Sequence, residues 1–247
     1  MHPFLFFFLL FNVVTFSDTG FASCFEDQDA LWQFKVVKMK YMPHPDYDTE
    51  SMEEMLFDAA EVWNSTNNGP FIEIETSGDE IGIPAFDGTN SIFVSDNWEW
   101  DPNFLALTFS HVHKGNKTIL ETDIGLNPGI NWVFGNFEDE DGNQDPTAFD
   151  LQSAMAHEFG HVLGIPHITE NGDATMFPEM ESYELIKRDI TEEDEICMKT
   201  LYDGRELTEP FSVDSSSNSG GGGCQSTHIA TPLSFLVLFV LFRKRKI

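Results

Sequence analysis

The 247-residue chain is poor in cysteine and in basic residues. Its three cysteines are too few for a small scaffold held together by many disulfides. Only 13 lysines and arginines accompany 42 aspartates and glutamates, for a net charge of -29. Contacts to nucleic-acid phosphates need clustered Lys and Arg, so this balance argues against a nucleic-acid-binding protein.

What the chain does have is enough apolar surface for a folded core. Hydrophobic residues make up 41% of the sequence and aromatic residues 13%, which excludes a disordered acidic chain. The length fits one domain with targeting segments at its ends. Without residues 1–22 and 224–247 the net charge is -32, so the folded part is more acidic than the whole chain. Such a domain repels anionic surfaces and attracts cations.

The N-terminal end has the pattern of an export signal. Residues 4–16 form an apolar run that is shorter than the roughly 20 residues of a membrane-spanning helix. Gly20 and Ala22 then precede Ser23 with the spacing of a signal-peptidase site, which predicts a signal peptide over residues 1–22. Two alternatives stay open: a lipidation motif that ends at Cys24, and a buried core segment.

The C-terminal end combines four features in order. Residues 212–223 are rich in Ser and Gly and predict a flexible linker, and Cys224 follows. The apolar stretch 229–242 precedes the basic cluster 243–246; as a helix it measures about 21 Å, less than the roughly 30 Å hydrocarbon core. This order resembles the bacterial MYXO-CTERM type of sorting signal, which implies that Cys224 is the processing or attachment point.

From this resemblance we expect segment 224–247 to contact the membrane and to hold an exported protein at the cell envelope or cell surface. A plain transmembrane anchor is the alternative. A GPI signal fits less well, because its tail should end in apolar residues rather than in a basic cluster.

One domain is expected over residues 23–211. Alternating or β-branched and aromatic residues predict five strands, and one amphipathic pattern predicts a helix over 52–64. The predicted strands are 34–41, 71–75, 91–95, 104–109 and 117–127.

The motif HEFGHVLGIPH, residues 157–167, carries the chemistry. On a helix that begins after Asp150, His157 and His161 lie one turn apart on the same face, where two imidazoles can share a Zn²⁺ ion. Gly164 can end the helix in a left-handed turn, so that the chain reverses and brings His167 back as a third ligand. Three histidines leave the fourth position of zinc open for water, as in catalytic zinc sites.

These residues resemble the metzincin zinc proteases, and in particular their matrixin (matrix metalloprotease-like) branch. Two further segments carry the resemblance: ATMFP at 174–178, similar to the Met-turn of the family, and DITEEDEICMKTLY at 189–202, similar to its C-terminal helix. The resemblance covers about residues 32–203. It implies an α+β fold with a twisted mixed sheet, a packing helix, an active-site helix and a C-terminal helix. It also implies that Met176 lies beneath the zinc site without being a ligand.

The sequence departs from the family pattern in two places. No cysteine lies in a segment that resembles the cysteine switch of the family, so latency through a thiolate on zinc is not expected. Gly125 stands where the family has a histidine in its structural-zinc strand, so we expect one zinc only. His111 and His113 are expected in an exposed loop. The acidic stretch 138–145 has oxygen ligands that suit Ca²⁺, with a solvated surface loop as the alternative.

The function implied by the motif is that of a zinc metalloendopeptidase acting on extracellular proteins. A zinc-bound water attacks the peptide carbonyl, and Glu158 is the general base. The strand within 104–109 is expected at the sheet edge, where it aligns an extended substrate. The partners are protein or peptide substrates, and we expect a monomer. The alternatives are a surface-attached adhesion module of metzincin fold that cleaves nothing, and a zinc hydrolase acting on other bonds.

A disulfide between Cys24 and Cys197 is the remaining prediction. An exported chain reaches an oxidising compartment, and one of these cysteines starts the domain while the other lies in its last helix. The bond would tie the N-terminal segment to the C-terminal helix. The alternatives are a buried free thiol at Cys197 and a lipidated Cys24.

Overall fold

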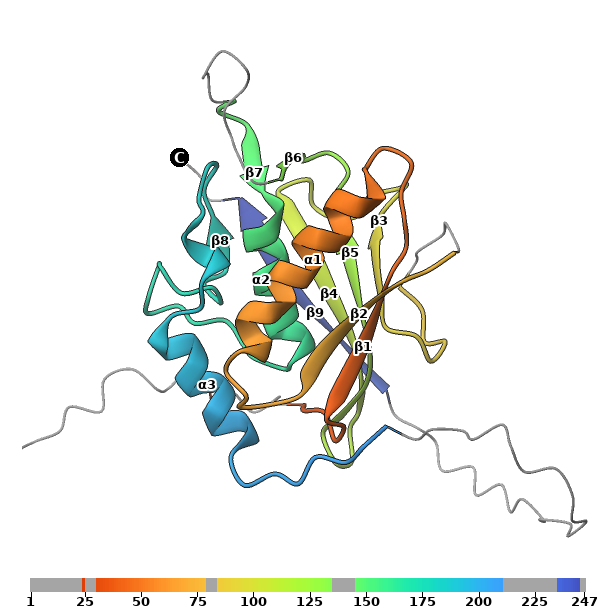
Figure 1. Cartoon of the computed structure of the whole chain (residues 1–247), viewed down its shortest axis with the longest axis vertical. Helices are drawn as coiled ribbons and strands as arrows, with labels where there is room; N and C mark the ends of the chain where they lie inside the picture. Colours follow the sequence, from red (N-terminus) through yellow and green to blue (C-terminus); the bar gives the residue numbers. More distant parts are fainter. Residues whose placement is uncertain (1–23, 25–29, 79–83, 135–144, 211–234, 245–247) are drawn as a thin grey trace, which may run out of the picture.

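A computed structural model describes Cys24 and residues 30–78, 84–134, 145–210 and 235–244 (Figure 1). The strands are β1 (Val36–Tyr41), β2 (Phe71–Thr76), β3 (Ser91–Val94), β4 (Phe104–His113), β5 (Thr118–Leu126), β6 (Asn131–Val133), β7 (Ala148–Asp150), β8 (Glu179–Met180) and β9 (Phe235–Lys244). The helices are α1 (Thr49–Asn64), α2 (Leu151–Val162), α3 (Glu192–Tyr202) and the short 3₁₀ helix η2 (Ile186–Arg188).

The main sheet has the order β2-β1-β3-β5-β4-β9-β8. Strands β2, β1, β3 and β5 pair in parallel, whereas β4 pairs with β5 in the antiparallel direction. Strands β6 and β7 form a separate parallel pair, and β7 leads directly into α2. The predicted α+β architecture with a mixed sheet is confirmed, as are the five strands and the helices predicted from residue patterns in the catalytic region.

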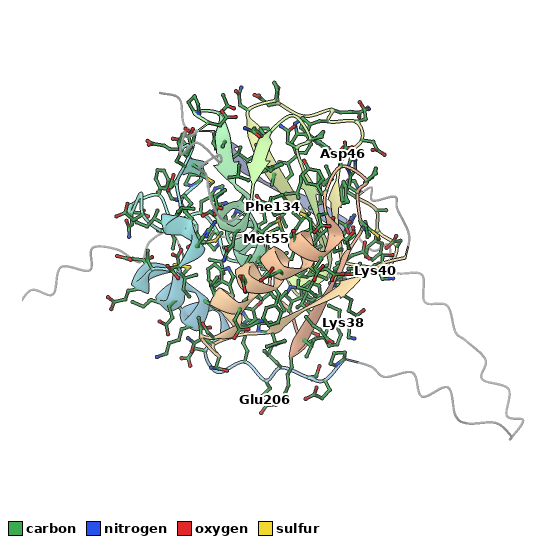
Figure 2. All side chains as sticks on the ribbon, turned by 45° about the horizontal axis from the view of Figure 1, so that its top comes forward. Lys38, Lys40, Asp46, Met55, Phe134 and Glu206 are labelled. Atoms are coloured by element: carbon green, nitrogen blue, oxygen red, sulfur yellow. A yellow bond between two sulfur atoms is a disulfide. The ribbon has the colours of Figure 1, made fainter. Side chains whose placement is uncertain are left out.

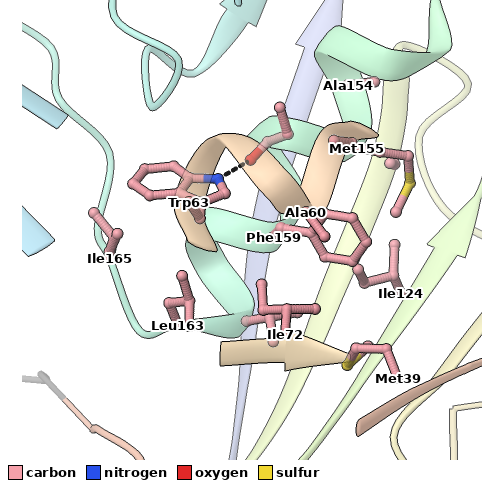
Figure 3. Close-up of a cluster of buried hydrophobic side chains, with 14 of the residues drawn as sticks. Met39, Ala60, Trp63, Ile72, Ile124, Ala154, Met155, Phe159, Leu163 and Ile165 are labelled. Atoms are coloured by element: carbon pink, nitrogen blue, oxygen red, sulfur yellow. Dashed lines mark hydrogen bonds between the residues drawn. The ribbon is translucent and has the colours of Figure 1, made fainter. Parts of the chain in front are cut away.

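Helices α1 and α2 lie together against one face of the sheet (Figure 1). The apolar stripe of α1 is buried between α2 and the sheet, as its spacing predicts. The indole of Trp63 is fully buried and donates a hydrogen bond to the carbonyl of Ala156 at 2.7 Å (Figure 3). Apolar side chains from both helices and the sheet pack around this bond. This packing holds α2 in place without any contribution from a metal ion.

The first two strands of the sheet, β2 and β1, carry charged side chains. Lys38 and Lys40 project from β1 (Figure 2), and Lys38 Nζ lies 2.5 Å from the carboxylate of Glu75 on the neighbouring strand β2. A second carboxylate, that of Glu73, lies 3.6 Å from the same nitrogen. These exposed pairs contribute little to stability, but they neutralise part of an otherwise acidic surface.

The C-terminal apolar segment differs from its prediction. Residues 229–242 were expected as a helix, but Phe235–Lys244 form strand β9, which runs antiparallel to β4 and parallel to β8. Strand β4 is therefore not an edge strand, contrary to the expectation for 104–109. The run of Phe, Leu and Val has high strand propensity, and β4 offers unpaired backbone groups for it to bind. Among the described residues, no helix is long and apolar enough to cross a membrane.

Several predictions lie outside the described residues. These are the signal peptide 1–22, the linker 212–223, Cys224 and nearly all of the acidic stretch 138–145. The domain boundaries, the processing role of Cys224 and calcium binding therefore stay predictions.

Candidate metal centre

Helix α2 presents its two histidines from a firmly capped position. The Asp150 side chain accepts the N–H of Ser153 at 2.9 Å, which is the predicted N-cap, and it also binds the guanidinium of Arg188. The helix ends at Val162, and Gly164 has a φ of 82°. A side chain at Gly164 would also lie 2.4 Å from the carbonyl of Ala30, so this turn requires glycine.

The turn after α2 brings the three predicted histidines together. His161 Nε2 lies 3.0 Å from His157 Nε2 and 3.1 Å from His167 Nε2. The Nδ1 atom of His157 lies 2.6 Å from the carbonyl of Thr175, and that of His161 lies 2.8 Å from the carbonyl of Ile165. Carbonyls only accept hydrogen bonds, so each Nδ1 carries the proton and each facing Nε2 is a lone pair.

Lone pairs this close repel each other unless a cation lies among them. Four ligands at about 2.1 Å from a tetrahedral zinc are about 3.4 Å apart, close to the separations seen between the Nε2 atoms. Burial lowers the pKa of His157 and His161 well below 6.5 and that of His167 to about 4, so all three are neutral near pH 7. The residues present therefore fit a zinc ion.

Glu158 places a carboxylate beside this cluster. Its side chain is fully buried, and its Oε2 accepts a hydrogen bond from the hydroxyl of Thr108 at 2.5 Å. The other oxygen, Oε1, has no hydrogen-bond partner among the described residues. Burial raises the pKa of Glu158 to about 8, and the Thr108 hydrogen bond opposes this rise. A carboxyl group with a raised pKa and a free oxygen is suited to accept a proton.

Met176 packs against α2, the helix that carries His157 and His161. It is fully buried, and its sulfur occupies the space next to Gly160: a Cβ atom at Gly160 would lie only 2.1 Å from it. The N–H of Ile168 donates to the Met176 carbonyl at 3.0 Å, so the turn also anchors the segment after His167.

Asp194 and Thr108 are site residues that the sequence analysis missed. Asp194, on α3, is fully buried, and its carboxylate accepts the backbone N–H of both Thr175 and Met176. The capping pattern Thr191-x-x-Asp194 was a usable signal for helix α3, but it does not show that the carboxylate reaches the Met-turn. For Thr108 no sequence signal exists, because only the fold places β4 against Glu158.

A second cluster lies on β4 and β5. Ligand atoms of His111, Glu121 and Asp123 lie within 4.8 Å of one another. His111 and His113 were expected in an exposed loop, but both lie within β4, and the ring of His111 lies 5.0 Å from the ring of Phe86 in a tilted arrangement. Glu121 and Asp123 are buried and accept backbone N–H groups from segment 85–91. Their oxygens thus hold this loop against the sheet.

The predicted cysteine pair lies together in the structure. Cys24 and Cys197 form a disulfide with a Cα–Cα distance of 5.5 Å, and both residues are buried. This link joins the start of the domain to α3. Helix α3 is thereby connected to the N-terminal segment as well as, through Asp194, to the Met-turn.

Comparisons with known proteins agree with this geometry. Residues 31–203 match the Matrixin family. Mouse stromelysin-1 is 27% identical over 207 residues, which cover 81% of this chain and 39% of stromelysin-1. Human matrix metalloproteinase-27 is 36% identical over 85 residues, which cover 31% of this chain and 16% of the relative. Matrix metalloproteinase-27 from Tupaia belangeri is 35% identical over 71 residues, which cover 29% of this chain and 14% of the relative.

The matched segments span well under half the length of these relatives. The family match covers both the His cluster on and after α2 and the Met-turn below it. It also covers the helix α3 that carries Asp194. The chain therefore belongs to the matrixin family of zinc metalloendopeptidases.

Proposed function

We propose that the protein is an exported endopeptidase that hydrolyses peptide bonds of extracellular proteins, with Glu158 as its general base. The observation that carries this proposal is that three neutral imidazole rings converge, two of them with their Nε2 lone pairs inward, on the helix that also holds a buried carboxyl group with one unpartnered oxygen. A structural metal site has no need for such a carboxylate, because all its ligand positions are filled.

The chain's own residues divide the work between them. His157, His161 and His167 would hold the zinc ion, which supplies a Lewis acid and lowers the pKa of water. Glu158 accepts a proton at Oε1 and later returns it to the leaving amine. Thr175 and Ile165 keep the histidines in the metal-binding tautomer through their carbonyls.

We further propose that substrates bind as extended strands next to β4. Strand β8 follows the Met-turn, and β9 lies between β4 and β8 in the sheet. Strands β4 and β8 therefore border the proposed path of the substrate. The pocket for the residue after the cleaved bond lies between α2 and the segment after Met176. In the structure this path is taken by β9, and a substrate strand has to replace it.

We propose that the chain is held at the cell envelope through the region around Cys224. The Ser/Gly linker, Cys224, the apolar stretch and the terminal basic cluster support this, because a basic end stays on the cytoplasmic side of a membrane. Anchoring requires segment 235–244 to leave β4. A Cys224→Ala variant that is still processed normally, in fractionated cells, would contradict the role of Cys224.

The test of hydrolysis uses the purified full chain against casein and a broad peptide library. We expect cleavage that a chelator abolishes and added zinc restores. Cleavage that persists after complete metal removal, or none at all by the zinc-loaded chain that ends at residue 234 and so lacks β9, would refute the proposal. The second outcome would favour a metzincin-fold module that binds without cleaving.

A further inference from the structure

Thr108 connects the middle of the sheet to the active-site carboxylate. It lies on β4 with a fully buried side chain, and its Oγ1 is 2.5 Å from Glu158 Oε2 and 3.4 Å from the Glu158 carbonyl oxygen. A hydroxyl has one hydrogen to donate, so the shorter contact to the carboxylate takes it. This bond joins β4 to α2 at the residue that carries the proposed proton transfer.

The bond determines which oxygen of Glu158 is free. The terminal torsion of a glutamate side chain is soft, so a carboxylate without a partner samples a broad range of orientations. A donor on Oε2 fixes the carboxylate plane and leaves Oε1, which has no partner among the described residues, as the acceptor. While the carboxyl group is ionised this hydrogen bond is charge-assisted, and such bonds are stronger than those between neutral groups.

We propose that Thr108 is a positioning residue for the proposed hydrolysis: its hydroxyl holds Glu158 by Oε2 so that Oε1 faces the reaction. The proposal rests on the assignment of Glu158 as the general base. This role belongs to the Thr108 side chain, whose hydroxyl contacts Glu158 rather than a metal ligand. Its effect reaches the reaction through Glu158 alone, and this separates it from a residue that only packs β4 against α2.

Two substitutions separate the hydroxyl from the methyl group of Thr108. Thr108→Val keeps the shape and removes the donor, whereas Thr108→Ser keeps the donor and removes the methyl. In the full chain we expect Thr108→Val to lower kcat for a peptide by about 10- to 100-fold, with KM changed less than about twofold. The zinc content stays at one ion per chain, and Thr108→Ser recovers most of kcat.

Thr122→Val is the matched control. Thr122 is also fully buried in the sheet, on β5, and its hydroxyl lies 3.8 Å from the sulfur of Met39 rather than near Glu158. We expect this variant to keep kcat. If Thr108→Ser loses as much kcat as Thr108→Val, or if Thr108→Val keeps kcat, the positioning role is refuted.

A double-mutant cycle tests whether Thr108 acts through Glu158. In a Glu158→Ala background, Thr108→Val should cause no further loss of kcat, because the group that it positions is gone. A loss of the same size as in the wild-type background would contradict the proposal.

Crystal structures give a readout that does not depend on activity. In the zinc-loaded wild type, Glu158 Oε2 should lie within hydrogen-bond distance of Thr108 Oγ1, and in Thr108→Val the carboxylate should turn away from this position. An unchanged carboxylate would refute the positioning role even if the protein hydrolyses nothing. If the carboxylate turns away in Thr108→Val but the wild type hydrolyses no peptide, the positioning of Glu158 by Thr108 stands and the peptidase assignment is refuted.

Discussion

Asp194 holds Met176 by its backbone: one oxygen of the Asp194 carboxylate accepts the Met176 N–H at 3.0 Å. The other oxygen accepts the N–H of Thr175 at 2.8 Å, and the Thr175 carbonyl faces Nδ1 of His157 at 2.6 Å. A single buried side chain on α3 thus supports both the apolar floor of the site and the orientation of one metal ligand. Groups that orient metal ligands in this way affect metal affinity strongly.

Asp194→Asn should therefore weaken zinc binding by about 10- to 100-fold, because the amide can accept with only one oxygen and its NH₂ group faces a backbone N–H. Competition with a chelator of known affinity measures the change. Glu192→Gln, an exposed substitution in the same first turn of α3, is the control. Equal zinc affinity in the Asp194 and Glu192 variants would show that the Asp194 carboxylate does not help to orient His157.

Asp123 predicts a pH dependence of stability. Burial raises its pKa to about 6, against the hydrogen bonds from Ser91 and Ala85 that lower it. As the pH rises from about 4 to 6, the unfolded chain loses this proton while the folded chain keeps it, so the free energy of unfolding falls with rising pH. A difference of about two units between the folded and unfolded pKa of Asp123 changes the free energy of unfolding by roughly 2–3 kcal/mol. This stabilisation is present below pH 4 and is lost above pH 6.

Asp123→Asn removes this titration, so its stability relative to the wild type should improve by up to about 2–3 kcal/mol between pH 4 and pH 7. Urea unfolding of both proteins at each pH unit measures the difference. Parallel curves across this range would contradict the assignment.

The disulfide between Cys24 and Cys197 should stabilise the domain. It closes a loop over a sequence separation of 173, which corresponds to about 5 kcal/mol in the chain-entropy model. Peptide mapping without reduction should find the two cysteines in one cross-linked peptide, and Cys197→Ser should lower the melting temperature. Separately alkylated peptides, or a diacylglyceryl mass on Cys24, would rule the bond out.

Strand β9 predicts that the C-terminal segment lowers activity. Because it pairs along β4 from Phe104 to His113, it covers the backbone groups that a substrate strand would use. Deleting residues 235–247 should raise the rate on a short peptide several-fold, whereas deleting only 245–247 leaves β9 intact and should change little. Equal rates for the full and the shortened chain would mean that β9 does not block the substrate path.

The metal site was largely predictable because its signals are local. Histidines four residues apart share a helix face by geometry alone, and Gly164 followed by Pro166 indicates where that helix must end. The Met-turn was predicted from the resemblance to the matrixins, because its residues have no spacing that predicts such a turn by itself. The oxygens and carbonyls that orient the ligands were not predictable, because Thr175, Asp194 and Thr108 reach the site only after distant segments pack together.

The C-terminal segment shows the limit of residue patterns most clearly. An apolar run of 14 residues has no periodicity that separates a buried strand from a buried helix. Its state in the structure depends on β4, more than a hundred residues earlier, whose second edge would otherwise be unpaired. The same holds for His111, where the sequence near a turn suggested a loop and the longer β4 places it in the sheet.

The role of Glu158 as general base is tested by the rate of peptide hydrolysis per bound zinc in Glu158→Ala compared with the wild type. It should be measured both in the full chain and in the chain ending at residue 234, so that β9 cannot hide the activity. We expect one zinc per chain in both proteins and a rate at least about 100-fold lower in the variant, because the metal remains while the proton acceptor is lost. The same rate per zinc in the two proteins would contradict this role of Glu158.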